Sequence, residues 1–374
     1  MLALDTTGAS LLHRLARGRG VVRIYVTAVI LTYIPLAIAA VFFGPLSPFF
    51  AGDGLRLPFL RDWNVAFLLL VSFPVIVIFT VTDDALLNRA LAKIEEHGII
   101  SPDAATENVL EDRWPRIFRK VNLAAYVVGI VGGALVTTWN YLTYSPPNVG
   151  FWIARHGDLV PAGYLFLYCI FLVYAVIPLY IARSVATSFF LRDIVRRTEL
   201  RMLPAHPDHC GGLRPIGHLG LRNQYVLSIL GLNVVALVLV THFYLTMTWS
   251  LRLLIVAAVT VYLLFGPVIF MGPLLSFRSG MIQAKERLMA DVAQRLRIEL
   301  TKLHEKVVTG AETITKEEED FIERLRKIGN VIDELPVWPF DARTLRKFVT
   351  AYIAPLILGA VGKRIGELLG QILR

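Results

Sequence analysis

The sequence has few cysteines and few charged residues for its length. Cys169 lies inside an apolar block and Cys210 in a polar loop, and there is no other cysteine among the 374 residues, which excludes a disulfide-stabilised scaffold. Charged residues make up 18% of the chain and hydrophobic residues 55%, a balance too apolar for an ordinary soluble domain. Because the apolar residues are gathered into long blocks, the composition indicates an integral membrane protein.

The sequence also lacks the common motifs of enzymes and nucleotide-binding proteins. It contains no Walker A loop, Rossmann glycine pattern, nucleophile elbow, kinase signature or HExxH segment. This lowers the expectation of an enzyme without excluding one. The net charge of +9 comes largely from basic residues that flank apolar blocks, a position typical of binding to anionic inner-leaflet lipids rather than to nucleic acid.

Six apolar blocks are long enough to cross a bilayer, whose ~30 Å hydrocarbon layer needs about twenty helical residues. The blocks are 24–43, 65–82, 121–143, 160–182, 224–246 and 253–275. The first is longer than the core of a signal peptide, so we expect it to be retained. The sequence predicts an all-α polytopic membrane bundle over residues 1–277, with two short helices in the loop 83–120.

The segments between the blocks differ strongly in basic residues. The N-terminal segment and the loops after blocks two and four carry seventeen Lys and Arg, and the other three loops carry four. The seventeen are Arg14, Arg17, Arg19, Arg23, Arg89, Lys93, Arg113, Arg116, Arg119, Lys120, Arg183, Arg192, Arg196, Arg197, Arg201, Arg214 and Arg222. Since basic flanks stay in the cytoplasm, the pattern predicts that both termini are cytoplasmic. An excess of Arg over Lys is typical of a GC-rich genome, so we expect a bacterial inner membrane.

After the sixth block the pattern remains helical, and two apolar stripes follow. The first is Met289, Val292, Leu296, Leu300, Leu303 and Val307, and the second is Phe321, Leu325, Ile328, Ile332 and Leu335. Thr315 and Glu318 have the spacing of a capping box that starts the second helix. We predict a cytoplasmic helical hairpin over 278–335. The heptad-like spacing also predicts a homo-oligomer, and packing within the chain and between subunits remain alternatives that can coexist.

The C-terminal region 336–374 contains an apolar run at 348–361 that is short for a full span and includes Pro355. From Val361 the pattern is amphipathic. The run suits a re-entrant or interfacial membrane-associated segment, and we expect the amphipathic helix from Val361 to lie on the inner leaflet or to pack beneath the bundle. A seventh span is the alternative.

The most distinctive polar segment lies between blocks four and five. It contains His206, Asp208, His209, Cys210 and His218, which are donor types that transition metals select. No standard zinc spacing is met, and the prolines and glycines of the loop also suit a tight turn in which Asp208 accepts backbone amide protons. The sequence therefore leaves a structural turn, a metal site and a pH- or ligand-sensing loop open, and it implies no other cofactor.

The string His206-Pro207-Asp208-x-x-Gly211-Gly212-Leu213, placed between two membrane spans, resembles a loop of an uncharacterised group of bacterial polytopic membrane proteins. The resemblance covers this loop and the general layout of the chain. It implies a membrane location and carries no activity with it.

Within the blocks, ionisable residues are almost absent. Asp83 and Asp84 fall at the inner end of block two, and Asn233 is the clearest polar residue at mid-span. Ion-coupled transporters usually place ionisable groups at mid-membrane, so the pattern disfavours that class. Gly129 and Gly133 form a small-xxx-small pair for close helix packing.

Two Gly-Pro steps fall in the sixth block, at Gly266-Pro267 and Gly272-Pro273. Proline removes a helical hydrogen bond and clashes with the preceding turn, so we expect a kink or break there. A static bend and a hinge that couples the cytoplasmic helices to the membrane part are equally compatible with the pattern.

Three functions fit these observations. The first is an oligomeric channel or pore-like protein that is gated or assembled through its cytoplasmic helices, since apolar constrictions can gate a pore. The second is a membrane-embedded sensor or scaffold that signals through the helical hairpin. The third is a membrane metal-dependent enzyme that uses the 206–218 loop.

Overall fold

The computed structural model describes residues 12, 20–43, 57–144, 151–155, 158–203, 206–208, 210–244, 249–309, 315–339, 345–347, 349–350, 352–355 and 357. In these residues the regular strands are confined to one short antiparallel hairpin, β1 (Ala154–Arg155) and β2 (Asp158–Leu159). Six helical segments are long and apolar enough to cross a membrane. The predicted all-α polytopic bundle is confirmed.

The six segments are longer than the apolar blocks that predicted them. Segment one is α2 (Val21–Leu31) with α3 (Tyr33–Phe43), and segment two begins after a 3₁₀ turn, η2 (Phe59–Arg61), and contains α4 (Trp63–Phe67), a π-helical turn η3 (Leu68–Ser72) and α5 (Phe73–Glu96). The others are α6 (Ala104–Tyr144), α7 (Pro161–Arg197), α8 (Arg214–Tyr244) and α9 (Trp249–Thr309). A further helix, α10 (Lys316–Asp333), follows α9.

We call the end of the bundle that holds the α5–α6 and α7–α8 connections the basic end, and the opposite end the far end. At the basic end α5 and α6 run on as continuous helices, so the expectation of two separate short helices in 83–120 is wrong. The reason is that Leu87, Leu91 and Ile94 continue the helical spacing of buried positions below the apolar block. Gly98, at φ 69°, then reverses the chain.

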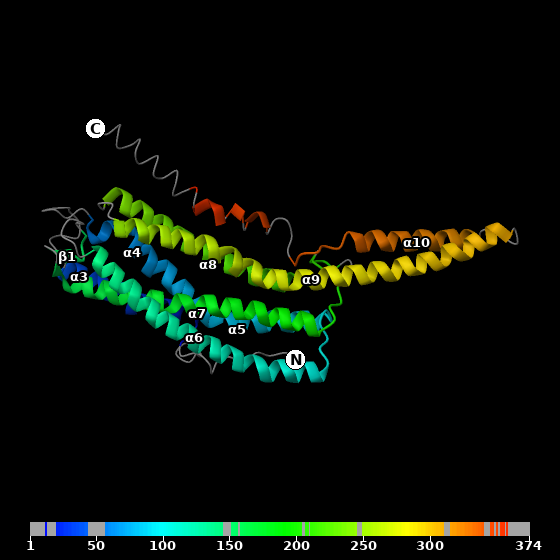
Figure 1. Ribbon diagram of the computed structural model, residues 1–374, viewed down its shortest axis with the longest axis horizontal. Helices are drawn as coiled ribbons and strands as arrows, with labels where there is room; N and C mark the ends of the chain where they lie inside the picture. The colour runs from blue at the N-terminus through cyan, green and yellow to red at the C-terminus, as the bar shows by residue number, and fades with distance from the viewer. Residues whose placement is uncertain are drawn as a thin grey trace, which may run out of the picture.

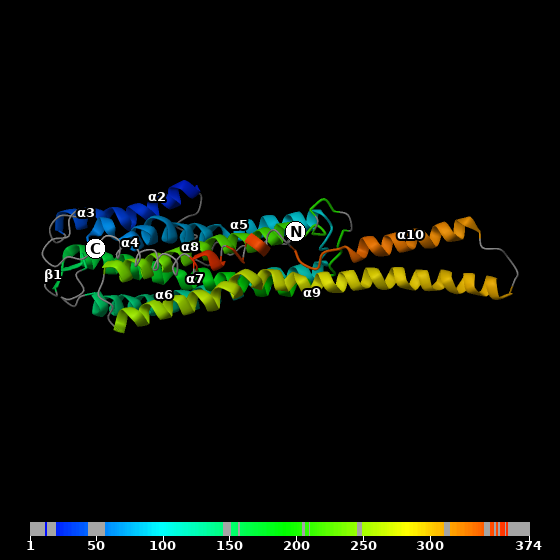
Figure 2. The same ribbon diagram turned by 90° about the horizontal axis from the view of Figure 1, so that it is seen from above.

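Four helices form a ring. Helix α5 packs against α7 and α8, and α9 packs against the same two, while α6 covers α7 from outside and the α2–α3 segment lies against α5 and α7. All of these helices run close to the long axis of the molecule (Figures 1 and 2). The interior of the ring is therefore bounded by α5, α7, α8 and α9.

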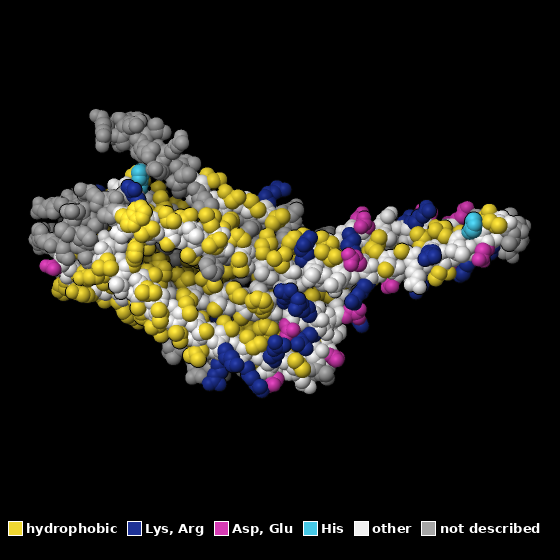
Figure 3. Space-filling model, viewed as in Figure 1, with side chains coloured by type: hydrophobic (Ala, Val, Ile, Leu, Met, Phe, Trp, Pro, Cys, Tyr) yellow, Lys and Arg dark blue, Asp and Glu magenta, His cyan; other side chains and the backbone are white. Residues whose placement is uncertain are grey.

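The outer face of α6 shows where a bilayer would meet the protein. Exposed hydrophobic side chains run from Leu123 to Leu142 on this helix. The nineteen helical steps between these two residues rise about 29 Å, which matches a hydrocarbon layer of ~30 Å. The space-filling view shows hydrophobic side chains over the bundle, and basic ones gathered where the bundle meets the projecting helices (Figure 3).

Helix α9 has 61 residues and projects well beyond the bundle, and α10 runs back along it as a hairpin (Figure 1). Thr315 N–H donates to Glu318 Oε2 over 3.0 Å at the start of α10, as a capping box requires. Leu325 and Ile332 are buried against α9, whereas Phe321 and Ile328 of the same stripe are 40% and 49% exposed. The hairpin thus leaves part of its apolar stripe without cover among the described residues.

The described part of the C-terminal segment lies beside α8 and α9. The guanidinium of Arg278 lies 4.7 Å from the ring centroid of Trp338, and Gln224 Nε2 donates to Lys347 O over 2.7 Å. A Cβ atom placed on Gly231 would lie 2.9 Å from Pro355 Cγ. Glycines on α8 and α9 leave room there for Tyr352 and Pro355. The helix expected from Val361 on the inner leaflet or beneath the bundle is not tested by these residues. Residues 358–374 lie outside the described residues.

Candidate functional site: a polar axis inside the helix ring

The interior of the ring has three levels, and they follow in order along each helix. On α7 residues 183–187 form the level nearest the basic end, 176–181 the middle and 166–174 the level nearest the far end. On α8, which runs in the opposite direction, the same levels are 222–223, 226–230 and 233–241. We call the three levels the ion-pair layer, the apolar layer and the far pocket.

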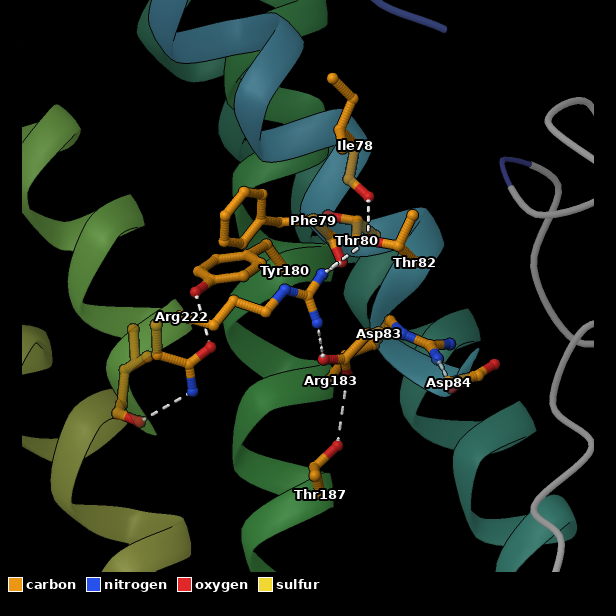
Figure 4. A network of polar contacts seen from close by, with 12 residues as sticks. Ile78, Phe79, Thr80, Thr82, Asp83, Asp84, Tyr180, Arg183, Thr187 and Arg222 are labelled. Carbon is orange, nitrogen blue, oxygen red and sulfur yellow. Dashed lines mark hydrogen bonds and ion pairs between the residues drawn. The ribbon is translucent and has the colours of Figure 1, made fainter. Parts of the chain in front are cut away.

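The first ion pair of the ion-pair layer joins Arg183 of α7 to Asp84 of α5 (Figure 4). Their side chains are only 1% and 5% exposed. Arg183 Nη1 also donates to Asn122 Oδ1 of α6 over 3.4 Å, and its guanidinium lies 5.6 Å from the ring centroid of Phe118. Burying each charge costs several kcal/mol, about what a close partner in low dielectric returns, so the pair holds only as a unit.

The second ion pair joins Arg222 of α8 to Asp83 of α5, with Nη1 and Oδ1 2.9 Å apart. Arg222 Nη2 donates to the carbonyl of Phe79 and, over 2.8 Å, to Thr82 Oγ1, and the guanidinium lies 4.5 Å from the Phe79 ring centroid. Figure 4 shows the Arg222 side chain reaching from α8 across the ring to α5. Because Thr187 Oγ1 of α7 donates to Asp83 Oδ2 over 3.4 Å, the two pairs tie α5, α7 and α8 together.

At three of the prolines inside the spans, another element supplies a donor to the backbone carbonyl that the proline frees. Tyr25 of α2 donates to Leu70 O, which Pro74 cannot reach, over 2.9 Å. Tyr352 of the C-terminal segment donates to Leu263 O, freed by Pro267, over 2.9 Å. Asn223 of α8 donates to Ile269 O, freed by Pro273, over 3.2 Å, and its own Oδ1 accepts from Tyr180.

The two Gly-Pro steps therefore do not break α9, which is one helix through both. Of the two expected outcomes the break is wrong, and a kink or hinge at these steps stays a prediction. The glycines leave room for neighbours here: a Cβ on Gly266 would lie 2.5 Å from Tyr352 Cε2, and one on Gly272 2.5 Å from Ser188 Oγ. Both steps are places of close approach between α9 and a neighbour.

The apolar layer separates the ion-pair layer from the far pocket. It is formed by buried side chains of α5, α7, α8 and α9, with the hydroxyl of Tyr180 turned towards Asn223. Its buried members are Ile76, Tyr180, Val226, Leu227 and Ile269. Leu274 belongs to the same cluster but lies beside Gly220, on the basic-end side of Asn223. Apolar side chains thus lie between the two polar levels.

The far pocket is a cavity of about 40 Å³, room for a few water molecules. Its polar lining consists of Asp62, Asn64, Asn140, Tyr174, Asn233 and Thr241. Asn233 Nδ2 of α8 lies 3.3 Å from Asn64 Oδ1 and 3.4 Å from Asn64 O. The π-helical turn begins at this level, with Leu68 in the lining. The pocket thus collects amide side chains from α4, α6 and α8.

Asp62 is the ionisable group of the far pocket and caps α4. Its carboxylate accepts from Trp152 Nε1 over 3.0 Å and from the Val65 N–H over 3.1 Å. Burial raises the pKa of Asp62 to about 6, although these hydrogen bonds act in the opposite direction. The group therefore changes charge near neutral pH.

The loop between α7 and α8 is organised by Asp208. Its carboxylate accepts from the backbone N–H groups of Cys210, Gly212 and Arg214 at 2.9, 3.0 and 3.2 Å, and His206 Nδ1 lies 2.7 Å from Oδ1. Burial opposes ionisation, but these hydrogen bonds outweigh it and lower the pKa of Asp208. The carboxylate oxygens are thus used to hold the turn that starts α8.

The two glycines of the loop have a steric role. Gly211 and Gly212 adopt φ values of 64° and 89°, which favour glycine. A Cβ on Gly212 would overlap Ile99 Cδ1, and Arg201 N–H donates to Ile99 O over 2.8 Å. The H-P-D-x-x-G-G-L string therefore docks the α7–α8 loop onto the α5–α6 connection.

The candidate metal ligands are only partly brought together. His209 lies outside the described residues, Cys210 is buried, and His218 belongs to α8. The His206 ring lies 5.2 Å from that of His97. Among the described residues no group of three His, Cys, Asp or Glu could hold a metal ion. The described geometry supports the turn.

Gly129 and Gly133 lie where α6 crosses α7. A Cβ on Gly129 would overlap Ala175 O, and one on Gly133 would lie 3.1 Å from Phe171 O. Gly132, between them, has nothing within 4 Å of a Cβ position. The i, i+4 glycine pair thus marks the face of α6 that meets α7.

The sequence reasoning missed the ion-pair layer, because Arg183 and Arg222 were counted as loop residues. The apolar blocks themselves are almost free of ionisable groups, but the helices continue past them, and there Arg183 is buried against α5 and α6 while Arg222 reaches α5. The available signal was that Asp83 and Asp84 end one apolar block while an arginine ends each of two others at the same side. Opposite charges at one level of neighbouring spans indicate an ion pair.

No family model, no curated protein and no solved structure matches this chain. Function must therefore be argued from the geometry.

Proposed function

We propose that the protein is a channel or pore-like protein of a bacterial inner membrane, with its basic end in the cytoplasm. The observation that carries the proposal is the far pocket. Buried polar side chains with room for water, placed inside a ring of membrane-length helices, mark a hydrophilic path rather than a packing core. In this conformation the apolar layer and the ion-pair layer close the path.

The hairpin is the proposed control element. Helix α9 supplies Ile269 to the apolar layer and continues without interruption into the hairpin. A displacement of the hairpin is transmitted to the closed layer because one helix carries both. The exposed Phe321 and Ile328 offer an apolar contact to the hairpin of a second copy, which fits a homo-oligomer assembled through these helices.

A sensor or scaffold is the second candidate, favoured by the same continuous helix. A 61-residue rod that joins the far end of the bundle to the hairpin tip can carry a signal with no permeation. The two functions differ in whether the apolar layer ever becomes hydrated.

The test is ion flux through purified protein reconstituted in liposomes. Val226 is fully buried in the apolar layer, whereas Val131 is 54% exposed on the outer face of α6. Val226→Ser favours hydration of a hydrophobic constriction, so flux at least about tenfold above wild type is expected. Val131→Ser makes the same chemical change outside the ring and is expected to behave as wild type.

Flux that is absent from both wild type and Val226→Ser, over a range of voltage, pH and ions, contradicts the channel and leaves the sensor. Equal flux through both valine variants contradicts a path along the ring axis. Thermal unfolding of each variant in detergent checks that the fold is intact.

A further inference from the structure

A groove between α6 and α7 lies at the basic end, outside the ring. Its volume is about 580 Å³. The lining changes along its length: Val121, Val185 and Phe189 are nearest the apolar block, and Arg113, Arg192 and Arg196 lie towards the end of α7. We propose that this groove binds one anionic phospholipid of the inner leaflet.

The apolar part of the groove continues the lipid-facing surface of the bundle. Leu123 on α6 is 67% exposed and starts the exposed band of that helix. Phe189 on α7 is 56% exposed although it lies six residues beyond the buried Arg183, towards the basic end. The hydrophobic surface therefore extends further towards the basic end at this groove. An acyl chain that lies on Val121 and Val185 remains in contact with the bilayer interior.

The basic part has two guanidinium groups available for a phosphate. Arg192 and Arg196 are one helical turn apart on α7, so their side chains share a face. Neither forms an ion pair with another described residue. Arginine is suited to a phosphate oxygen pair because its donors form a planar fork.

The one carboxylate in the groove is already occupied. Asp193 accepts from Trp114 Nε1 over 3.0 Å and from Arg197 Nε over 2.9 Å, and Arg113 Nη1 lies 3.9 Å away. It therefore opposes an anionic headgroup only weakly. The charge left in the groove is positive, and basic pockets between helices at this face of a membrane are suited to anionic headgroups.

A second cavity of about 670 Å³ lies on the other side of Arg192 and Arg196, between α7 and α9. Arg197 and Arg287 also line it, and Arg287 is paired with Glu199 at 2.6 Å. A soluble phosphate compound would occupy this side. The continuity of the α6–α7 groove with the lipid-facing surface favours a lipid, and the experiment separates the two.

The experiment measures lipid binding to the full chain in nanodiscs of phosphatidylcholine that contain phosphatidylglycerol. Lipids retained after extraction are counted by native mass spectrometry. The wild type is expected to retain one phosphatidylglycerol in preference to phosphatidylcholine. Arg192→Gln with Arg196→Gln is expected to reduce that preference about tenfold or more, since each basic residue near a membrane surface contributes to anionic-lipid binding.

The matched control is Arg119→Gln with Lys120→Gln, which removes two exposed charges from α6 near the same end, outside the groove. It is expected to leave the retained lipid in place. An equal loss from both double variants overturns the proposal in favour of a diffuse surface charge. Retention that is unchanged by Arg192→Gln with Arg196→Gln overturns it directly.

A third variant separates a lipid from a soluble anion. Val185→Trp fills the apolar part and leaves both arginines, so phosphatidylglycerol retention is expected to fall while binding of inorganic phosphate does not change. If Val185→Trp retains the lipid, or if millimolar inorganic phosphate displaces it from the wild type, the site is one for a soluble anion and the proposal fails.

Discussion

The far pocket and the ion-pair layer both place polar groups between the helices of the same bundle, but they satisfy those groups in different ways. In the ion-pair layer every charge has a close partner on another helix. In the far pocket amides meet at 3.3 Å or more beside a small cavity. The paired layer holds the helices together, whereas the pocket tolerates rearrangement, so the ring is built to stay closed at the basic end.

Removing one partner of a buried pair gives the largest expected effect. Arg183→Met removes the guanidinium that is paired with the buried Asp84 carboxylate, which is expected to lower the free energy of unfolding by about 3–5 kcal/mol. Thermal unfolding in detergent measures the loss. The control is Arg116→Met, which breaks an exposed pair with Asp112 and is expected to cost less than about 1 kcal/mol. Similar losses from both variants would contradict a closed, charge-paired layer.

In the far pocket we expect Asp62 to make the free energy of unfolding depend on pH. The folded pKa of Asp62 is about 6, above its ordinary value of 3.8. Between pH 4 and 6 the unfolded chain has lost this proton while the folded chain keeps it. The free energy of unfolding therefore falls by about 3 kcal/mol as pH rises through this range, and then levels off. Unfolding measured against pH, as the difference between wild type and Asp62→Asn, checks this; parallel curves would show that Asp62 titrates normally.

Replacing each of the two asparagines of α8 by leucine compares the stability contributed at the ion-pair layer with that at the far pocket. Asn223→Leu removes the donor to Ile269 O and the amide that accepts from the Tyr180 hydroxyl, at an expected cost of about 1–3 kcal/mol. Asn233→Leu loses longer contacts next to a cavity, and is expected to cost under about 1 kcal/mol. Unfolding of the two variants under the same conditions gives the difference. A larger loss at Asn233 would reverse the comparison.

The smallest effect is expected at the edge of the ring. Tyr352→Phe removes the donor to Leu263 O and keeps the stacking on Tyr262, whose ring centroid is 5.1 Å away. A cost of about 1 kcal/mol is expected for the single hydrogen bond. Tyr168→Phe, on a half-exposed ring of α7, serves as the control and is expected to leave unfolding unchanged. A loss above about 3 kcal/mol would mean that the C-terminal segment also holds the ring together.

The number and type of the helices could be predicted from the sequence, because long apolar blocks admit few other structures. Their ends could not. Leu87 and Phe118 continue the buried face below the blocks, yet a hydropathy average over charged neighbours hides such positions. The course of residues 345–355 was also missed, since the groove that receives Tyr352 depends on glycines of two other helices.

The candidate site was less accessible than the fold. A structural turn held by Asp208 was one of the three alternatives for the 206–218 loop, because an Asp followed by glycines is typical of a turn. The partners of Asp83 and Asp84 lie about one hundred residues away or more, and which arginine meets which carboxylate depends on the order of helices around the ring. The donors to the carbonyls that Pro267 and Pro273 free could not be predicted for the same reason. Each donor comes from an element whose position the local sequence does not define.

The capped carbonyls also imply an order of events during biosynthesis. Asn223 precedes Ile269 in the chain, so its donor is already in place when α9 is inserted. Tyr352 follows Leu263 by 89 residues, so the donor to the Leu263 carbonyl does not exist until long after that part of α9 has been made. Until then this carbonyl is without the Tyr352 donor in a lipid environment, where unpaired polar groups are costly. Docking of the C-terminal segment is thus a late step of assembly, and a chain truncated before Tyr352 would leave the Leu263 carbonyl without this donor.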